Sequence, residues 1–229
     1  MNQIVTEGII LTRTDYGEAD RILTLLTPDQ GKLRLLAKGV RRVKSKLAGG
    51  IELFSVSTIT FVKGRGEIGT LVSTRLVKHY GRIVQDLDRT MLGYELLKQL
   101  NKLTEDQPGP EYFDLLARMF EGLDDPAVPL PLIRLWFTAR LLSLSGHTPN
   151  LQTTAEGDKL EPGKTYDFDA GMMCFRQHPH GTFSTNAIKF LRLSFAVATP
   201  QALASVQGAG ELAALCDRVL TNALREHLL

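Results

Sequence analysis

The sequence predicts an α+β protein in which a small β-barrel is followed by a helical domain. Residues 1–80 contain five short segments rich in β-branched or alternating apolar residues, separated by turns containing Gly, Pro and Asp. After residue 80, apolar residues recur every three or four positions, which is typical of amphipathic helices. With 229 residues and 43% hydrophobic content, the chain can bury a substantial core. We therefore expect two domains, residues 1–80 and 81–229.

Five strands are predicted in the first domain, in the order in which the turns divide it. Short turns separate the first three strands, a longer loop precedes the fourth, and a Gly-rich turn joins the fourth to the fifth. The predicted strands are residues 4–14, 21–27, 32–38, 51–62 and 67–78. Five strands within about 75 residues are typical of a small closed barrel such as an OB-fold, and an SH3-like barrel is the competing topology.

The third strand and the loop after it, residues 31–50, carry seven positive charges and no acid. In the strand, basic residues alternate with apolar ones, so one face is cationic and the other apolar. The loop opens at Gly39 and is too charged to pack. The seven cations are Lys32, Arg34, Lys38, Arg41, Arg42, Lys44 and Lys46. A protein surface without a binding function normally carries both positive and negative charges. This stretch of positive charge therefore predicts contact with a polyanion.

The whole chain has a net charge of only +2, but the charge is unevenly distributed. Residues 1–80 carry 13 Lys and Arg against 7 Asp and Glu, whereas residues 81–229 carry 14 against 18. This asymmetry predicts that the polyanion binds to the first domain and that the second domain has another task.

The second domain is predicted to be helical, with an irregular insert at residues 147–183. Its predicted helices are residues 83–104, 110–122, 129–145, 185–196, 200–207 and 209–228. In the first helix we expect Leu87, Met91 and Tyr94 to begin the buried stripe. Trp136 and Cys216 are expected in the core. A hairpin is expected between Tyr166 and Phe175 of the insert.

No motif in the chain predicts catalysis. Gly64, Gly66 and Gly69 spell G-x-G-x-x-G, but the β-branched residues that follow predict a strand, whereas a dinucleotide site needs a helix there. Cys174, His178 and His180 are too few for a structural zinc site. We therefore expect a binding protein without a cofactor, not an enzyme. Two cysteines and the absence of a targeting or membrane-spanning segment indicate a cytoplasmic protein.

The first third of the chain resembles the amino-terminal region of the RecO family, whose members are bacterial recombination mediators. The resemblance is carried by Tyr16-Gly17-Glu18 with Asp20, by Leu25-Leu26-Thr27, by Gly31-Lys32-Leu33, and by Ala37-Lys38-Gly39-Val40-Arg41-Arg42 followed by Lys44-Ser45-Lys46. It is strong over residues 3–80. The later order of helices, insert and helices also agrees with the family.

The resemblance implies an OB-fold followed by a helical domain, in a protein that binds single- and double-stranded DNA and anneals complementary strands. It implies that RecR is a partner, and that the pair helps load the recombinase onto strands coated by single-stranded-DNA-binding protein. The helical domain would contact the acidic, hydrophobic-ended tail of that coating protein. Family DNA contacts fall on Arg34, Lys38, Arg41, Arg42, Lys44 and Lys46. We add Lys32, Lys63, Arg65 and Tyr16 to the predicted site.

The insert departs from the family. Many relatives carry two Cys-x-x-Cys pairs that bind zinc, whereas here Thr153 and Thr154 stand near the first pair and Cys174 alone near the second. We therefore expect a zinc-finger-like insert without its cysteines and without zinc.

Two other functions are compatible with these patterns. The barrel could serve RNA or ribosome assembly, because OB-folds bind both nucleic acids. A hydrolase or metal-dependent nuclease built around the insert is the third hypothesis. Base stacking in the barrel groove could use Tyr16, Phe54 or Phe61, although Phe61 is expected in the core.

Overall fold

The computed structural model describes residues 2–64, 66–104 and 107–228. The chain forms two compact units, Met1–Asp124 and Asp125–Leu229, so the first unit contains the barrel together with the first two helices. The predicted domain boundary after residue 80, where strands give way to helices, stays a prediction. Among the described residues, no helix has the length and apolar character needed to cross a membrane.

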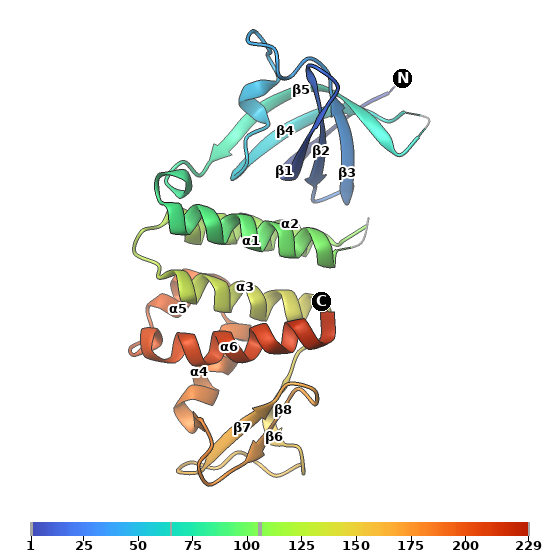
Figure 1. Ribbon diagram of the computed structural model, residues 1–229. Helices are drawn as coiled ribbons and strands as arrows, with labels where there is room; N and C mark the ends of the chain where they lie inside the picture. The colour runs from blue at the N-terminus through green and yellow to red at the C-terminus, as the bar shows by residue number, and fades with distance from the viewer. Residues whose placement is uncertain (1, 65, 105–106, 229) are drawn as a thin grey trace. The chain divides into compact units, whose positions relative to one another are not determined.

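Five strands close into a barrel in the order β1-β2-β3-β5-β4, with β1 pairing with β4 (Figure 1). The neighbouring strands are antiparallel except for β3 and β5, which are parallel. The strands are β1 (Gln3–Tyr16), β2 (Asp20–Leu26), β3 (Lys32–Ala37), β4 (Ser55–Val62) and β5 (Ile68–His79). This five-stranded Greek-key order is the OB-fold topology, so the predicted fold of the first domain is confirmed.

The barrel core is built from the inward-facing residues of all five strands. On β3, Leu35 and Ala37 are buried and Arg34 is exposed, as the alternation predicted. The core also includes Phe61, which is 0% exposed. The buried cluster consists of Ile10, Leu23, Leu25, Leu35, Ala37, Val40, Ile51, Ile59, Phe61 and Leu71.

The glycines of the G-x-G-x-x-G stretch have a structural role in the barrel. Gly64 and Gly66 lie in the β4–β5 turn and Gly69 lies in β5, and because residues Ile68–His79 form a strand, no helix follows these glycines. A Cβ on Gly69 would lie 2.8 Å from Leu35 Cδ2 and 3.0 Å from the carbonyl oxygen of Val62. Gly69 is therefore needed because β5 approaches β3 closely there.

The fourth strand begins four residues later than predicted. The chain first forms the short helix η1 (Ala48–Gly50), and Phe54 then adopts a positive φ of 56°. This backbone conformation precedes the first residue of β4. The Phe54 ring is buried, with 1% of its surface exposed. The ring lies against α1 (Leu87–Leu103), where a Cβ on Gly93 would come within 2.6 Å of Phe54 Cε1.

Helix α1 lies within the predicted range of residues 83–104, but it begins only at Leu87, after the short helix η2 (Ile83–Gln85), and it buries a different face. The predicted stripe is wrong in its first half, since Leu87, Met91 and Tyr94 are 75%, 61% and 45% exposed. The buried face contains Arg89 and Gly93 together with Leu92, Leu96, Leu97 and Leu100. Arg89 made this face appear polar in the sequence. Its guanidinium instead donates hydrogen bonds to the carbonyls of Gly122 and Leu123, at the end of α2 (Pro110–Asp124).

The helices of the second unit surround a core that includes Trp136 and Cys216, as predicted. They are α3 (Leu130–Leu144), α4 (Thr185–Ala196), α5 (Pro200–Ala204) and α6 (Ala209–Leu228). Trp136 Nε1 donates to the carbonyl of Val197 at 3.1 Å. Burial raises the pKa of the Cys216 thiol to about 12, which keeps it a neutral core residue.

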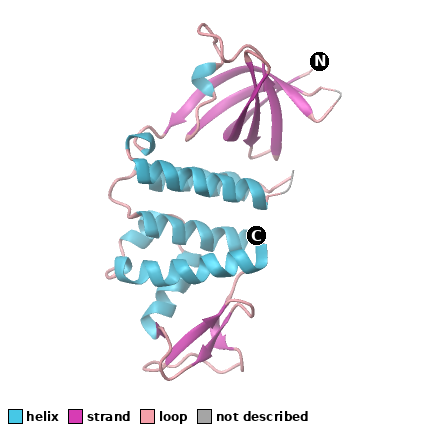
Figure 2. Ribbon diagram, in the orientation of Figure 1, coloured by secondary structure: helices cyan, strands magenta, loops and turns pink. Residues whose placement is uncertain are grey.

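The insert predicted at residues 147–183 contains more strand structure than the single hairpin that was expected. It contains a four-stranded sheet in the order β6-β8-β7-β9 (Figure 2). The strands are β6 (Asn150–Thr154), β7 (Thr165–Asp169), β8 (Cys174–Gln177) and β9 (Phe183–Ser184). The predicted hairpin is present, because Phe168 pairs with Phe175. Tyr166, Phe175 and Phe183 form the buried side of the sheet. A likeness to a zinc finger stays a proposal.

Candidate nucleic-acid interface

The loop after β3, residues 38–47, is here called the cationic loop. It is tied to the β1–β2 turn, because the amide of Gly39 donates to Asp20 Oδ1 at 2.7 Å and the amide of Arg41 donates to the carbonyl of Ala19 at 2.9 Å. Val40 inserts into the barrel core. The loop is therefore held at the end of the barrel that also carries Tyr16, whose exposed fraction is 55%. In OB-folds this end and the β2–β3 face bind oligonucleotides.

Six exposed cations, here called the cationic row, come from β3, the cationic loop and the β4–β5 turn. Arg34 pairs in register with Ile68, the first residue of β5, so the β4–β5 turn carrying Lys63 begins beside it. Lys38 is the first residue after β3 and lies four residues beyond Arg34 in the chain. The row consists of Arg34, Lys38, Arg42, Lys44, Lys46 and Lys63. In residues 2–64, 66–104 and 107–228, no ion pair involves any of the six. Arg65, also predicted to bind DNA, lies outside the described residues.

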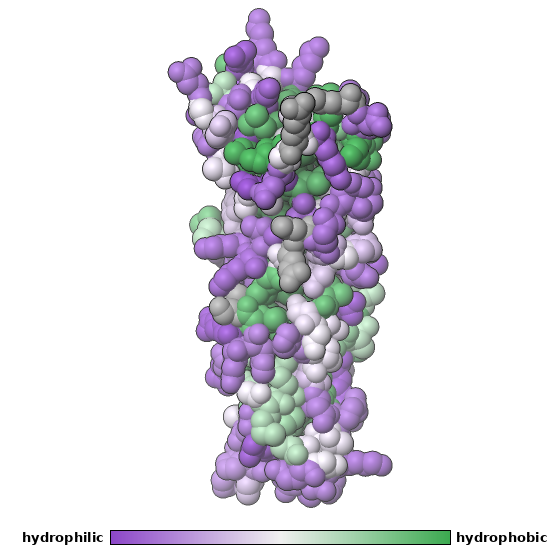
Figure 3. Space-filling model, turned by 90° about the vertical axis from the view of Figure 1, so that its right-hand side faces the viewer, coloured by the Kyte–Doolittle hydropathy of each residue, from purple (hydrophilic) through white to green (hydrophobic). Residues whose placement is uncertain are grey.

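The strand face beside the cationic row is uncharged. Arg34 stands opposite Thr24 of β2, and Thr24 stands opposite Thr12 of β1. Directly opposed residues of antiparallel strands point to the same face, so these hydroxyl side chains lie beside the guanidinium. Figure 3 shows hydrophilic side chains projecting from the end of the barrel. Among the described residues, no acid of α1 or α2 forms an ion pair with these six cations.

Arg41 differs from the other loop cations because it is paired. Its guanidinium lies 3.5 Å from Asp15 Oδ2 and donates to the carbonyl of Gly17 at 3.4 Å. Asp15 also accepts a hydrogen bond from Arg21 at 2.8 Å. This bond from Arg21, and then the charge of Arg41, lower the pKa of the Asp15 carboxyl. Asp15 thus stabilises the cationic loop while offsetting part of its charge.

Replacing Asp15 with Asn is expected to strengthen DNA binding roughly twofold to fivefold, because it releases the charge of Arg41. The folded pKa of Asp15 is lowered, so its contribution to stability is present above the unfolded pKa and is lost as the pH falls through the folded value. Asp15→Asn should remove that part of the acid dependence. Fluorescence anisotropy and unfolding curves across acid pH measure both effects, and weaker DNA binding would contradict this role.

Lys32, predicted to bind DNA, has another contact in the structure. Its Nζ donates to the carbonyls of Asn101 at 2.9 Å and Thr104 at 3.0 Å, at the end of α1. A cation at a helix C-terminus satisfies carbonyls that lack partners within the helix and interacts favourably with the helix dipole. Lys32 therefore joins the barrel to α1. The prediction that it also binds DNA stays untested.

Replacing Lys32 with Met is expected to lower the free energy of unfolding by about 2 kcal/mol, because two charge-assisted hydrogen bonds are lost while the apolar stem is kept. DNA affinity and its salt dependence should change little. Chemical denaturation and anisotropy titrations separate the two effects. A large loss of DNA affinity with unchanged stability would instead make Lys32 part of the DNA contact.

Of the three aromatic residues considered for base stacking, only Tyr16 is accessible. Phe54 and Phe61 are 1% and 0% exposed. Phe61 is in the core, as expected, and the possibility of stacking on Phe54 is excluded by its burial. Of these three aromatic residues, this face therefore offers at most one for base stacking.

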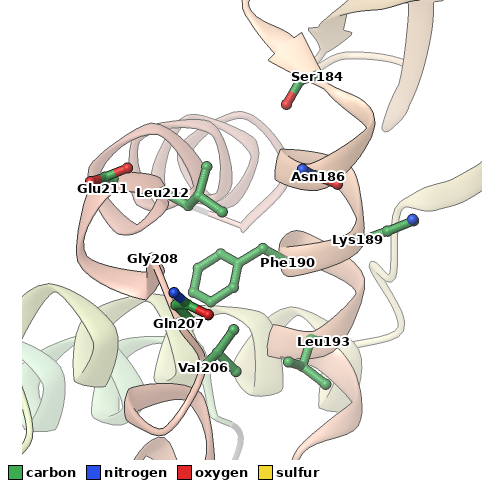
Figure 4. A pocket seen from close by; sticks show the side chains of 10 residues that line it. All are labelled: Ser184, Asn186, Lys189, Phe190, Leu193, Val206, Gln207, Gly208, Glu211 and Leu212. Atoms are coloured by element: carbon green, nitrogen blue, oxygen red, sulfur yellow. The ribbon is translucent and has the colours of Figure 1, made fainter. Parts of the chain in front are cut away.

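The second unit contains a separate pocket of about 510 Å³ between α4, α6 and the loop before α6 (Figure 4). Its apolar lining comes from Phe190, Leu193, Val206 and Leu212. Figure 4 shows the Phe190 ring directed into this space, whereas the side chain of Lys189, which also lines the pocket, extends from α4 away from the Phe190 ring. The size and apolar lining suit a side chain of a bound peptide.

The cysteine and histidines of the insert do not form a metal site in the described part of the chain, where no group of three potential ligands occurs. Cys174 is buried, and burial raises the pKa of its thiol. His178 instead pairs with Asp167 at 3.3 Å. These contacts disfavour both metal binding and a reactive thiolate.

Sequence reasoning missed the two acids that hold the cationic loop, Asp15 and Asp20. Their signal was the turn DYGEAD, in which short acids precede and follow Gly17. Such residues commonly accept hydrogen bonds from nearby backbone amides.

Comparison with known proteins identifies similar chains over nearly the whole length. Residues 1–80 match the family model described as Recombination protein O N terminal, and residues 84–229 match Recombination protein O C terminal. A protein of Dehalococcoides mccartyi called DNA repair protein RecO is 33% identical over 194 residues, which are 82% of this chain and 76% of that protein. Proteins with the same name from Halalkalibacterium halodurans and Desulfatibacillum aliphaticivorans are 29% and 32% identical, covering 82% and 79% of this chain and 76% and 69% of their own lengths.

Proposed function

The chain belongs to the RecO family of DNA repair proteins, and from this premise we propose that it is a recombination mediator that binds single- and double-stranded DNA and anneals complementary strands. The observation that carries the proposal is the cationic row, whose six members have no acidic partner in the described part of the chain. Arg41 and Tyr16 extend this surface at the loop end of the barrel.

The proposed mechanism is electrostatic and needs no covalent step. Each phosphate that is neutralised by Lys or Arg releases condensed counterions, so affinity should depend steeply on salt and little on base sequence. When one cationic surface holds two polyanionic strands, their mutual repulsion is screened and their effective concentration rises. Base pairing then forms between strands that the protein holds together.

A strand-annealing assay tests this proposal directly. Two complementary oligonucleotides with a fluorophore and a quencher are mixed with and without the protein. We expect the protein to accelerate quenching at low salt and to lose this effect as salt is raised. An annealing rate that the protein leaves unchanged at low salt would contradict the proposal.

In this proposal the helical unit recruits the protein to coated strands in the cytoplasm, at the nucleoid. The partner is the acidic, hydrophobic-ended tail of the single-stranded-DNA-binding protein, and RecR joins the complex to help load the recombinase. The pocket between α4 and α6 supports this role because its apolar lining can hold a hydrophobic terminal side chain. Lys189, which also lines the pocket, can attract the tail's acids.

Val206→Asp is expected to weaken binding of a peptide copying that tail by at least about tenfold, because it places a carboxylate in the pocket lining. Isothermal titration calorimetry measures the dissociation constant. Ala214→Asp is the matched control, since Ala214 is exposed on α6 and does not line the pocket. Equal binding by both variants would exclude this pocket as the docking site.

A further inference from the structure

Helix α1 carries a line of large apolar side chains on its exposed side. Leu87, Met91 and Tyr94, here called the α1 stripe, are separated by four and three residues and therefore lie on one side of the helix. Even Tyr94, the least exposed of the three, is 45% exposed. Single exposed apolar residues are common on protein surfaces, whereas a continuous line of them indicates an interaction surface.

The first unit itself holds the α1 stripe in this exposed position. The ring of Tyr94 lies edge-on to the buried ring of Phe54, with ring centroids 5.3 Å apart. On the other side of the helix, Gly93 lies close to Phe54, and Arg89 donates to the carbonyl of Leu123 at the end of α2. Turning α1 to bury the stripe would break these contacts, so the first unit cannot cover the stripe.

The charges beside the stripe have opposite signs at its two ends. Asp88 follows Leu87 in the first turn of α1. Lys98 lies 11 residues after Leu87, which is close to three full turns, so it continues the stripe on the same side. Both side chains are exposed, and neither forms an ion pair among the described residues. The surface is therefore complementary to a copy of itself that runs in the opposite direction.

We propose that the α1 stripe binds the α1 stripe of a second copy of this chain, with the two helices antiparallel about a two-fold axis. An axis between Met91 and Tyr94 sets Met91 of each copy against Tyr94 of the other. The same axis brings Lys98 of each copy beside Leu87 and Asp88 of the other, so the interface gains two ion pairs. A parallel arrangement would bring like charges together, which disfavours it.

A second copy is the occupant that these features favour. A two-fold interface uses the same surface twice, so one apolar stripe and one pair of opposite charges are enough to build both halves. Each copy in such a dimer carries its own cationic row, and the dimer can therefore hold two strands. Self-association does not depend on DNA binding, so it can be measured on the protein alone.

Sedimentation velocity of the whole chain tests the proposal, at protein concentrations from about 1 to about 200 μM, because an interface this small is expected to be weak. We expect the sedimentation coefficient of wild type to rise with concentration toward that of a dimer. Met91→Lys should remain monomeric, because it places a charge within the apolar contact. Met172→Lys is the matched control, since Met172 is a 55% exposed methionine of the insert, and it should self-associate like wild type.

Exchanging the two charges tests the antiparallel arrangement. Asp88→Lys alone and Lys98→Asp alone each bring like charges together across the interface, and each should weaken self-association by at least about threefold. The double variant restores opposite charges and should recover nearly wild-type self-association. Unfolding curves of the three variants verify that the first unit remains folded.

The outcomes are distinct. A wild type that remains monomeric over this concentration range overturns the proposal and leaves the stripe to a different partner. Self-association that Met91→Lys leaves intact also overturns it, because the contact would then lie elsewhere on the chain. Failure of the double variant to recover overturns the antiparallel pairing of Asp88 with Lys98.

Discussion

Reversing Arg42, Lys44 and Lys46 together to Glu is expected to lower the affinity for single-stranded DNA by at least about a hundredfold at low salt. Three phosphate contacts are lost and three repulsive charges are added, so the slope of log affinity against log salt should become shallower by about 2. The fold should survive, because these side chains are exposed and make no ion pair among the described residues. Arg41 is left unchanged because it contacts Asp15.

The matched control reverses Lys159, Arg218 and Arg225, three exposed cations of the second unit. This variant changes the net charge equally, so it separates a local contact from a general effect of charge. We expect it to keep nearly wild-type affinity and slope. If both triple variants lost affinity equally, net charge rather than the cationic row would govern binding.

Replacing Arg89 with Met is expected to destabilise the first unit by about 3 kcal/mol. Arg89 is only 9% exposed, and its Nη1 donates to the carbonyl of Leu123 at 3.0 Å. Its guanidinium also lies 3.9 Å from Asp86, the residue that caps α1. Removing a nearly buried charged donor leaves these acceptors unpaired, whereas Met preserves the packing of the stem.

Denaturation in guanidinium chloride, followed by circular dichroism, measures this effect as a lower midpoint with a similar slope. Arg82→Met is the control, because the Arg82 side chain is exposed. It should change stability by less than about 0.5 kcal/mol. A loss of less than about 1 kcal/mol in Arg89→Met would show that the helix end finds other donors.

The strands of the barrel could be predicted because each carries its own local signal. The alternation on β3 correctly placed Leu35 and Ala37 inside and Arg34 outside. The turn residues indicated where the strands end. The strand predicted after Gly69 excluded a dinucleotide-binding site, because such a site needs a helix there. These features depend on neighbours in sequence, so a single chain is enough to reveal them.

Long-range contacts could not be predicted in the same way. Lys32 looked like the other cations of its strand, yet its partners are carbonyls at Asn101 and Thr104. Arg89 also led to a wrong prediction of the buried face of α1. Its hydrogen-bond acceptors lie at the end of another helix, so its burial could not be inferred from the sequence of α1. In both cases a charged side chain satisfies a helix end that only the fold brings near it.

The strands of the insert had only a weak signal in the sequence. Residues 165–169 alternate as TYDFD, with the two aromatic residues on one side, which is the period of a strand. The strands are only two to five residues long, and strands this short are hard to tell from irregular chain.

The most direct test of the account is the salt dependence of wild-type binding to a single-stranded oligonucleotide of mixed sequence. If the six cations of the row each neutralise a phosphate, log affinity should fall against log salt concentration with a slope of about −4. A slope near zero, or an affinity that salt leaves unchanged, would contradict the claim that this barrel holds DNA through an unopposed row of positive charge.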